Sequence, residues 1–129
     1  MSTQEADEDG QRGAIVNMAS VAAFDGQIGQ AAYSASKGGI VGMTLPVARD
    51  LSAAGIRLNT VAPGLIDTPI YGEGPESEAF KAKLGESVLH PKRLGSGDEL
   101  ASMVMELLTN PYMNAETIRV DGGIRMPPK

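Results

Sequence analysis

Residues 13–19 read Gly-Ala-Ile-Val-Asn-Met-Ala, an almost continuous apolar run that ends at Ser20. Apolar runs of this length, without alternation, are typical of strands that are buried on both faces of a parallel sheet. We therefore predict a buried parallel strand over residues 13–19. Its carboxyl end would place the Ser20 hydroxyl where ligands bind over a parallel sheet.

The rest of the chain alternates between helical and strand-like patterns. Residues 31–51 carry apolar side chains at helical spacing, which predicts a helix in which Pro46 removes one backbone hydrogen bond. Ser96 and Glu99 have the spacing of a capping box before a further helix. The remaining predicted elements are strands at 57–62 and 117–120, a helix at 75–84, and loops at 21–30 and 64–74. Strands that alternate with helices predict a parallel α/β sheet with right-handed crossovers.

Tyr33 and Lys37 stand four positions apart at the start of the helix predicted over residues 31–51. Residues at this spacing share one face of a helix. A tyrosine near a fixed positive charge can lose its proton well below its usual pKa of about 10. It can then act as a general acid or base near neutral pH. The spacing alone is a weak motif, because a surface helix with a solvated lysine has it too.

The sequence around and after this pair makes the motif more specific. The informative stretches are residues 31–39 (AAYSASKGG), 56–64 (IRLNTVAPG) and 118–123 (IRVDGG). In this order and spacing, and with the strand that ends in Ser20, these stretches resemble the C-terminal half of the short-chain dehydrogenase/reductase family. Residues 20–27 and 91–95 resemble one subgroup in particular. That subgroup is the type-2 3-hydroxyacyl-CoA dehydrogenases, also known as 17β-hydroxysteroid dehydrogenase type 10. Its members often have proline at the position of Pro46, which implies a single helix over residues 31–51.

The resemblance covers nearly all of the chain from Gly13 onward and implies the C-terminal half of a Rossmann-like, doubly wound parallel sheet. Three strands with intervening helices would lie in residues 13–129, after a polar, acidic lead-in at residues 1–12 that begins near the end of a preceding helix. The first half of a complete member carries a Gly-rich turn that binds the dinucleotide phosphates. This chain has no such turn and no counterpart of the family's catalytic asparagine. We therefore expect it to be a fragment, from a truncated gene, a late start codon or processing.

The resemblance implies three catalytic residues. Tyr33 would exchange a proton with the hydroxyl or carbonyl oxygen of the substrate. Lys37 would assist this exchange and hydrogen-bond the nicotinamide ribose, and Ser20 would hydrogen-bond the reacting oxygen. Judged from the residues alone, each also has a plain structural interpretation, namely a tyrosine at a helix start, a solvated lysine and a loop serine.

Contacts with NAD and substrate are also implied by the resemblance. Pro63 and Gly64 would bring the chain over the nicotinamide, next to Tyr33 and Lys37. The backbone of Ile66 and the hydroxyl of Thr68 would reach the carboxamide, although Thr68 has the alternative of a turn hydroxyl before proline. Ser20, Gln27 and Gln30 would contact the substrate, unless the two glutamines are exposed loop amides. Residues 65–94, with a short helix between Gly-rich flanks, would form the substrate lid.

Composition excludes several classes of protein. With 129 residues the chain can form one small domain, and the absence of cysteine excludes disulfides and thiolate metal sites, so we assign no metal ligand. The net charge is −5, and no basic cluster indicates a nucleic-acid surface. No apolar run approaches the roughly 20 residues of a membrane span, and the acidic N-terminus is unlike a signal peptide. We expect a soluble cytoplasmic protein without nucleic-acid or membrane partners.

Two residues receive no part in the chemistry. His90 is the only histidine and stands before a proline, which is typical of a structural position. Ala115 stands where the family usually has glycine. Because alanine disfavours positive φ, it weakens the prediction of a turn before the last strand, with no consequence for catalysis.

Two functions remain open. In the first, the chain is an NAD-dependent oxidoreductase that moves hydride between the nicotinamide and a secondary alcohol or ketone, by resemblance a 3-hydroxyacyl-CoA or a hydroxysteroid. NADP is not excluded, because the residue that selects the cofactor is absent. In the second, the chain is an inactive remnant that associates with full-length relatives through the Tyr33 helix. By resemblance this helix packs against a partner subunit, which also implies a homo-oligomer. Without a phosphate-binding turn, we expect the isolated chain to bind NADH weakly or not at all.

Overall fold

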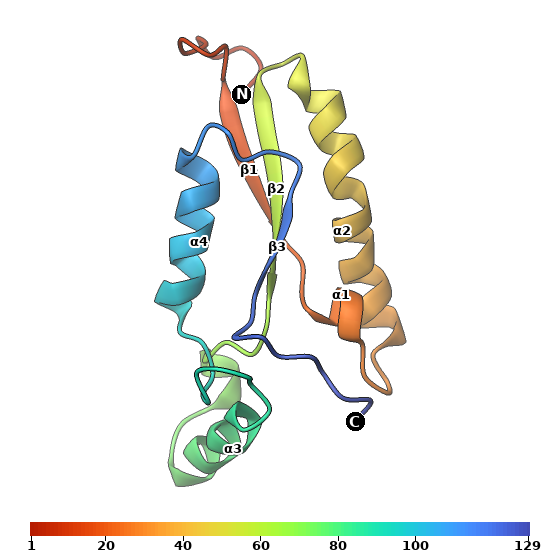
Figure 1. Cartoon of the computed structure of the whole chain (residues 1–129), viewed down its shortest axis with the longest axis vertical. Coiled ribbons are helices and arrows are strands. Elements are labelled where there is room, and N and C mark those ends of the chain that lie inside the picture. Colours follow the sequence, from red (N-terminus) through yellow and green to blue (C-terminus); the bar gives the residue numbers. More distant parts are fainter.

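The computed structural model describes all residues from 1 to 129 and contains one parallel sheet of three strands (Figure 1). The strands are β1 (Gly13–Met18), β2 (Ile56–Pro63) and β3 (Thr117–Val120), in the spatial order β1-β2-β3. Helix α2 (Ala31–Ser52) joins β1 to β2, and helix α4 (Gly97–Thr109) precedes β3. The two helices lie on opposite sides of the sheet, which confirms the predicted doubly wound α/β architecture.

Strand β2 carries the core of the molecule, because both of its edges are paired and α2 and α4 contact it. All of its residues except the last are buried, and Val61 exposes no surface. The buried polar side chains of this strand are hydrogen-bonded, as burial of a polar group requires. The Thr60 hydroxyl lies 2.7 Å from the Thr44 hydroxyl of α2, and the Asn59 amide donates to the Met113 carbonyl at 2.9 Å.

Strand β1 is half-buried, so the prediction of a fully buried strand over residues 13–19 is wrong in this respect. It pairs with β2 on one side only, and its other edge carries backbone groups without a strand partner. The Met18 side chain at its end is 44% exposed, whereas the next residue, Ala19, is buried. The apolar pattern indicated the type of element, but burial also depends on what covers the second edge of the strand.

Two short helical turns lie in the segments that we expected to be loops. One is α1 (Ala22–Asp25), at whose start the Ala22 N–H donates to Ser20 Oγ at 3.1 Å. The other is the 3-10 turn η1 (Pro69–Tyr71), where proline at the first position loses no intrahelical hydrogen bond. Both turns are too short to show hydrophobic periodicity, which is the signal that predicts a helix from sequence.

The longer elements lie close to their predicted bounds. Helix α2 continues through Pro46 as one helix, and the turn that follows it contains Gly55 with a φ of 72°. Helix α3 (Pro75–Gly85) begins at its proline, and both hydrogen bonds of the capping box at Ser96 are formed. Ala115 adopts a φ of 61°, so alanine holds here the backbone conformation that favours glycine.

The lead-in at residues 1–12 contains turns but no helix, so the predicted end of a preceding helix is wrong. This segment is bound to the amino-terminal edge of the sheet. The Arg12 N–H donates to the Gly55 carbonyl at 2.6 Å, next to the start of β2. The Asp7 carboxylate accepts from the amides of Asp9 and Gln11, which closes the turn between them.

None of the helices, including the 22-residue α2, combines the length and the hydropathy needed to cross a bilayer. The cytoplasmic location expected from composition stays a prediction.

The buried Arg57 of β2 fastens α4 to the sheet. Its guanidinium donates to the carbonyls of Leu107, Leu108 and Met113 at 2.8, 2.9 and 2.7 Å, and also to the Gln11 side chain. Leu107 and Leu108 belong to the last turn of α4, whose carbonyls have no partner within the helix. The cation also interacts favourably with the negative end of the helix dipole. Burial lowers the pKa of Arg57, but an arginine remains charged at neutral pH.

Replacing this guanidinium should destabilise the fold. We expect Arg57→Met to lower the free energy of unfolding by about 2–4 kcal/mol, because buried carbonyls lose charged donors and gain no replacement. Urea unfolding followed by circular dichroism measures the change. Arg49→Met removes an exposed arginine of α2 and should have an effect within about 0.5 kcal/mol. Equal effects of the two substitutions would contradict the role assigned to Arg57.

Candidate active site

A hollow of about 340 Å³ lies at the carboxyl ends of β1 and β2. This is the edge at which open parallel sheets bind their ligands. All of the residues predicted to be catalytic or to contact the cofactor line it: Ser20, Tyr33, Lys37, Pro63, Gly64, Ile66 and Thr68. The structure therefore brings together residues from three segments that are separated in sequence. Their individual chemical roles stay predictions.

Tyr33 and Lys37 are presented by the first two turns of α2. The Lys37 Nζ lies 5.9 Å from the centroid of the Tyr33 ring and donates to the Met18 carbonyl at 3.2 Å. The first contact is a cation–π interaction, and the second uses the carbonyl at the end of β1. The ammonium is thus held between the phenol and the sheet. Half of the Tyr33 side chain remains exposed, so a ligand in the hollow can reach it.

Ser20 and Pro63 lie side by side because backbone pairing between the strands continues past the end of β1. The Val21 N–H donates to the Pro63 carbonyl at 3.0 Å, one residue beyond Ser20. Ser20 Oγ accepts the Ala22 N–H at 3.1 Å and donates to no protein group. The hydroxyl hydrogen is therefore free to donate to a ligand oxygen in the hollow.

Ile66 offers unused backbone groups to the hollow. It forms an isolated parallel bridge with Gly95, in which the Gly95 N–H donates to Leu65 O at 2.9 Å and Gly95 O accepts the Asp67 N–H at 2.8 Å. Neither the N–H nor the carbonyl of Ile66 itself is hydrogen-bonded within the chain. An amide carries both a donor and an acceptor, so this pair of groups is complementary to a carboxamide.

Gly64 allows the close approach of β2 and β3 at the floor of the hollow. Its N–H donates to the Val120 carbonyl at 2.9 Å. A Cβ added at this position would lie 2.6 Å from the Cβ and 2.8 Å from the Cα of Asp121. The backbones at Gly64 and Asp121 can approach each other this closely because glycine has no side chain.

Four residues of the hollow were not predicted from the sequence: Met18, Ala19, Tyr71 and Leu100. Met18 and Ala19 could have been found, because they directly precede Ser20 in the same strand-like run. Tyr71 and Leu100 belong to η1 and to α4, and no spacing motif links either of them to Ser20. Only the folding of the segment between β2 and α4 brings them to the hollow.

Tyr71 is a second phenol in this hollow. Its ring packs against Phe80 of α3 at a centroid distance of 6.2 Å, and its carbonyl accepts from the Ser77 hydroxyl at 2.8 Å. Burial, aided by the charge of Asp67, raises the pKa of Tyr71. Tyr71 is therefore protonated at neutral pH and can donate a hydrogen bond, but it does not act as a base there.

Gln27 and Gln30 do not line the hollow. The Gln30 side chain accepts the Gln27 N–H at 3.0 Å, and the Gln27 side chain donates to the Pro127 carbonyl at 3.0 Å. Both amides are thus engaged with the loop and with the C-terminal residues. Their contact with a substrate stays a prediction.

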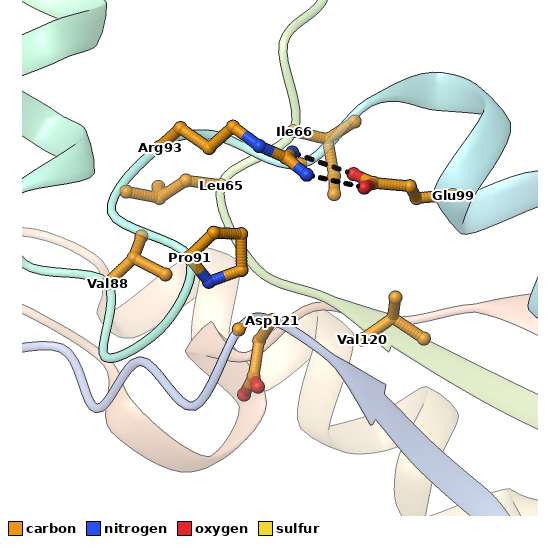
Figure 2. Close-up of a pocket in the computed structure, with 10 residues that line it drawn as sticks. Leu65, Ile66, Val88, Pro91, Arg93, Glu99, Val120 and Asp121 are labelled. Atoms are coloured by element: carbon orange, nitrogen blue, oxygen red, sulfur yellow. Dashed lines mark hydrogen bonds and ion pairs between the residues drawn. The ribbon is translucent and has the colours of Figure 1, made fainter.

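A separate apolar cavity of about 260 Å³ lies beside the hollow and shares only Ile66 with it (Figure 2). Leu65, Val88, Pro91 and Val120 form its walls. Figure 2 shows the Arg93–Glu99 ion pair at its rim, with donor–acceptor distances of 3.0 and 2.7 Å. Arg93 and Glu99 are paired with each other, and Asp121, which also lines the cavity, is paired with Arg119 and Arg125. We therefore place the acid–base chemistry in the hollow at the strand ends instead.

Comparisons with known proteins agree with this geometry. Residues 3–125 match the model of a short-chain dehydrogenase/reductase family that is described as Enoyl-(Acyl carrier protein) reductase. The chain belongs to this family. The prediction of a short-chain dehydrogenase/reductase, made above from motif order and spacing, is confirmed.

Several relatives of this short-chain dehydrogenase/reductase chain are dehydrogenases of the predicted subgroup. The 3-hydroxyacyl-CoA dehydrogenases type-2 of Drosophila melanogaster and Homo sapiens are each 56% identical to it over 128 residues. A rat 3-oxoacyl-[acyl-carrier-protein] reductase is 39% identical over 116 residues. A crystal structure of a 3-hydroxyacyl-CoA dehydrogenase type-2 from Mycobacterium avium superimposes with a TM-score of 0.92 at 49% identity.

The chain spans about half the length of the relatives it matches. The two type-2 dehydrogenases cover 99% of this chain, and the chain covers 49% and 48% of them. The solved Mycobacterium structure has the same relation, with 99% of this chain and 49% of that chain aligned. Activities and substrates of the complete relatives are therefore proposals for this chain.

Filling the space at Gly64 should separate the ends of β2 and β3. We expect Gly64→Ala to lower the free energy of unfolding by about 1–3 kcal/mol, because the new Cβ overlaps the backbone of Asp121. Gly39→Ala is the matched control, since a Cβ at this position of α2 meets no atom within 4 Å. It should raise stability by about 0.5–1 kcal/mol. Urea unfolding tests both, and equal effects would contradict the close approach.

The ion pair at the rim of the cavity predicts acid sensitivity. Hydrogen bonding from Arg93, aided by the Ser96 N–H, lowers the pKa of Glu99 from 4.5 to about 2. Because the pKa is lower in the folded chain, the stabilisation is complete above pH 4.5 and is lost as the pH falls towards 2. We expect the difference in unfolding free energy between the wild type and Arg93→Gln to shrink over this range in urea titrations. Arg49→Gln, at an exposed position, should show no such trend.

Proposed function

We propose that this chain forms the catalytic and nicotinamide-binding part of an NAD-dependent oxidoreductase that interconverts a secondary alcohol and a ketone. The observation that supports this most is the common hollow. Ser20, Tyr33 and Lys37 line it together at the carboxyl ends of β1 and β2, where a parallel sheet binds ligands. A purely structural role of each residue does not require the three side chains to line the same hollow.

The chain's own residues supply the proton chemistry. Tyr33 donates its phenolic proton to the ketone oxygen during reduction and takes a proton from the hydroxyl during oxidation. Lys37, held by the Met18 carbonyl, stabilises the negative charge on the phenol oxygen. Ser20 donates its free hydroxyl hydrogen to the same substrate oxygen and stabilises the charge that develops there. The nicotinamide, when bound, supplies or accepts the hydride.

The hollow is chemically suited to a nicotinamide. Pro63 and Ile66 provide apolar surface for a flat ring, and the free N–H and carbonyl of Ile66 are complementary to the carboxamide. The hydroxyl of Thr68 is a further donor at the same wall. No residue of the chain forms a phosphate-binding turn, so we expect the chain to hold the nicotinamide end and to bind the dinucleotide weakly. We take NAD as the cofactor on the subgroup resemblance alone.

We propose a 3-hydroxyacyl-CoA and its 3-oxoacyl partner as the substrate pair. The names of the relatives support this class, because 3-hydroxyacyl-CoA dehydrogenase and 3-oxoacyl-[acyl-carrier-protein] reductase both describe chemistry at the third carbon of an acyl thioester. A hydroxysteroid is the alternative substrate that the subgroup implies. Residues 65–94 would form the lid over this substrate, with Tyr71 facing the hollow.

The second candidate is a non-catalytic chain that associates with longer relatives. The unpaired edge of β1 favours it, together with Met43 and Leu45, apolar side chains of α2 that are more than 40% exposed. The same surface of α2 supports homo-oligomer formation in the catalytic proposal. Cofactor binding and turnover separate the two candidates.

The first test is an NADH titration of the purified chain, followed by nicotinamide fluorescence, with acetoacetyl-CoA added at the end. We expect weak binding and slow oxidation of NADH, because the hollow receives only the nicotinamide end. Tyr33→Phe should reduce oxidation at least about a hundredfold, since a positioned general acid contributes about 10²–10⁴ to the rate. It should leave NADH binding nearly unchanged.

Tyr112→Phe is the matched control, because this tyrosine is 97% exposed and lies outside the hollow. It should keep the wild-type rate. Oxidation that is equally fast in Tyr33→Phe would remove Tyr33 from the acid–base role. Absence of both NADH binding and oxidation in the wild-type chain would reject the catalytic proposal and favour association with longer relatives, which size-exclusion chromatography of mixtures would detect.

A further inference from the structure

Helix α1 lies in the chain between the residues that carry the proposed chemistry, with Ser20 before it and Tyr33 after it. Its first turn holds Ser20 directly. The Ala22 N–H donates to Ser20 Oγ at 3.1 Å, and the Ala23 N–H donates to the Ser20 carbonyl at 3.0 Å. The direction in which the Ser20 hydroxyl points therefore depends on the placement of α1.

The other end of α1 is held by a residue of β3. Asp25 is the last residue of α1, and its two carboxylate oxygens accept from Arg119 Nη1 and Nη2 at 3.0 and 2.7 Å. Both side chains are largely buried, at 12% and 20% exposure. The guanidinium also lies 5.3 Å from the centre of the Phe24 ring. The hydrogen bonds from Arg119 lower the pKa of Asp25, so the carboxylate is charged at neutral pH.

Arg119 is itself fixed in place on the sheet. Its Nε donates to Asp121 Oδ2 at 2.7 Å, and Nη2 donates also to the Ile124 carbonyl at 2.9 Å. The Met126 N–H reaches the Asp25 carboxylate at 3.2 Å, so the C-terminal residues join the same network. One guanidinium thus connects β3, the C-terminal residues and α1.

We propose that Arg119 is a positioning residue for the reaction. It fixes α1 through Asp25 and thereby aims the Ser20 hydroxyl at the reacting oxygen. Arg119 does not line the hollow and hydrogen-bonds none of the residues that line it, whereas it bonds α1 directly through Asp25. The inference rests on the proposed function for what Ser20 does to the substrate, but the link from Arg119 to Ser20 can be measured without turnover.

Amide hydrogen exchange of the whole chain, read by NMR, measures this link. The Ala22 amide reports the hydrogen bond to Ser20 Oγ. In Arg119→Gln we expect the Ala22 amide to exchange about tenfold faster, a factor equivalent to the loss of roughly one hydrogen bond. The amides of β2 should keep their protection. Arg125→Gln is the control, because Arg125 bonds Asp121 and carries the same charge but does not bond Asp25.

A double-mutant cycle separates positioning from general destabilisation. Ser20→Ala removes the acceptor of the Ala22 amide, so adding Arg119→Gln to it should produce no further increase in Ala22 exchange. A merely structural loss would instead accelerate exchange equally in both backgrounds, and that result would overturn the proposal. Unchanged Ala22 exchange in folded Arg119→Gln would overturn it as well.

Two further variants keep the proposal testable. If Arg119→Gln does not fold, Asp25→Asn removes the charge of the pair and leaves the bonds of Arg119 to Asp121 and Ile124 in place. We expect the same faster exchange at Ala22. Asp25→Glu keeps the carboxylate and should restore at least half of the lost protection; no restoration would contradict the role of the ion pair.

Kinetics add a readout at the substrate. Where the wild-type chain oxidises NADH, Arg119→Gln should lower kcat about tenfold and leave KM for NADH unchanged, because Ser20 stabilises charge in the transition state only. A change in KM for NADH alone would contradict the proposal. A wild-type chain without turnover would reject the proposed function, while the exchange measurements would still decide the link between Arg119 and Ser20.

Discussion

The site depends on the backbone pairing of β1 with β2. This pairing continues past the end of β1, where the Ala19 N–H donates to Val61 O at 2.8 Å and the Val21 N–H donates to Pro63 O at 3.0 Å. Parallel strands end at the same edge of a sheet, so the pairing brings Ser20 next to Pro63 although 43 positions separate them in sequence. The crossover helix between the two strands must then begin at this edge. Tyr33 and Lys37 stand in its first two turns, so the same topology that joins the strands also delivers the phenol and the ammonium to the hollow.

Periodicity predicted the order of strands and helices, whereas the site residues were predicted from the resemblance to a known family. The third strand was predicted at its observed bounds of Thr117–Val120, and the resemblance implied that α2 is one helix through Pro46. What the sequence did not show are features created by contacts between distant segments. Helix α1 is bonded to Ser20 and to an arginine 94 positions from Asp25, and Tyr71 reaches the hollow through the folding of the segment between β2 and α4. The prediction that β1 is buried was wrong for the same reason, because the apolar pattern of a strand does not show how many strands pair with it.

Two arginine–carboxylate ion pairs of this chain have similar geometry but differ in burial, and therefore in what each contributes to the structure. Arg93 and Glu99 form a bidentate pair at the rim of the cavity, where each side chain is about half exposed. Solvent screens such a pair, which limits the stability that it contributes at neutral pH. The donor–acceptor distances between Arg119 and Asp25 are nearly the same, but these two side chains are largely buried. Loss of one partner there would leave a charged group without solvation. A buried pair therefore holds its two segments in one relative position, which is what a loop next to a reacting group requires.

Under the proposed function, the hollow would supply one part of the interactions that a dinucleotide enzyme needs. Proton transfer, charge stabilisation and contact with the nicotinamide act at the reacting atoms, and the candidate residues for all three lie in this chain. Most of the affinity for a dinucleotide comes from phosphate groups at a helix N-terminus after a Gly-rich turn, and the chain has no such turn. Binding energy from remote parts of a ligand is what holds the reacting centre in place. The geometry at Ser20, Tyr33 and Lys37 therefore has to be maintained by the protein itself, and in this fold the backbone pairing of β1 with β2 and the buried contacts of α1 supply that rigidity.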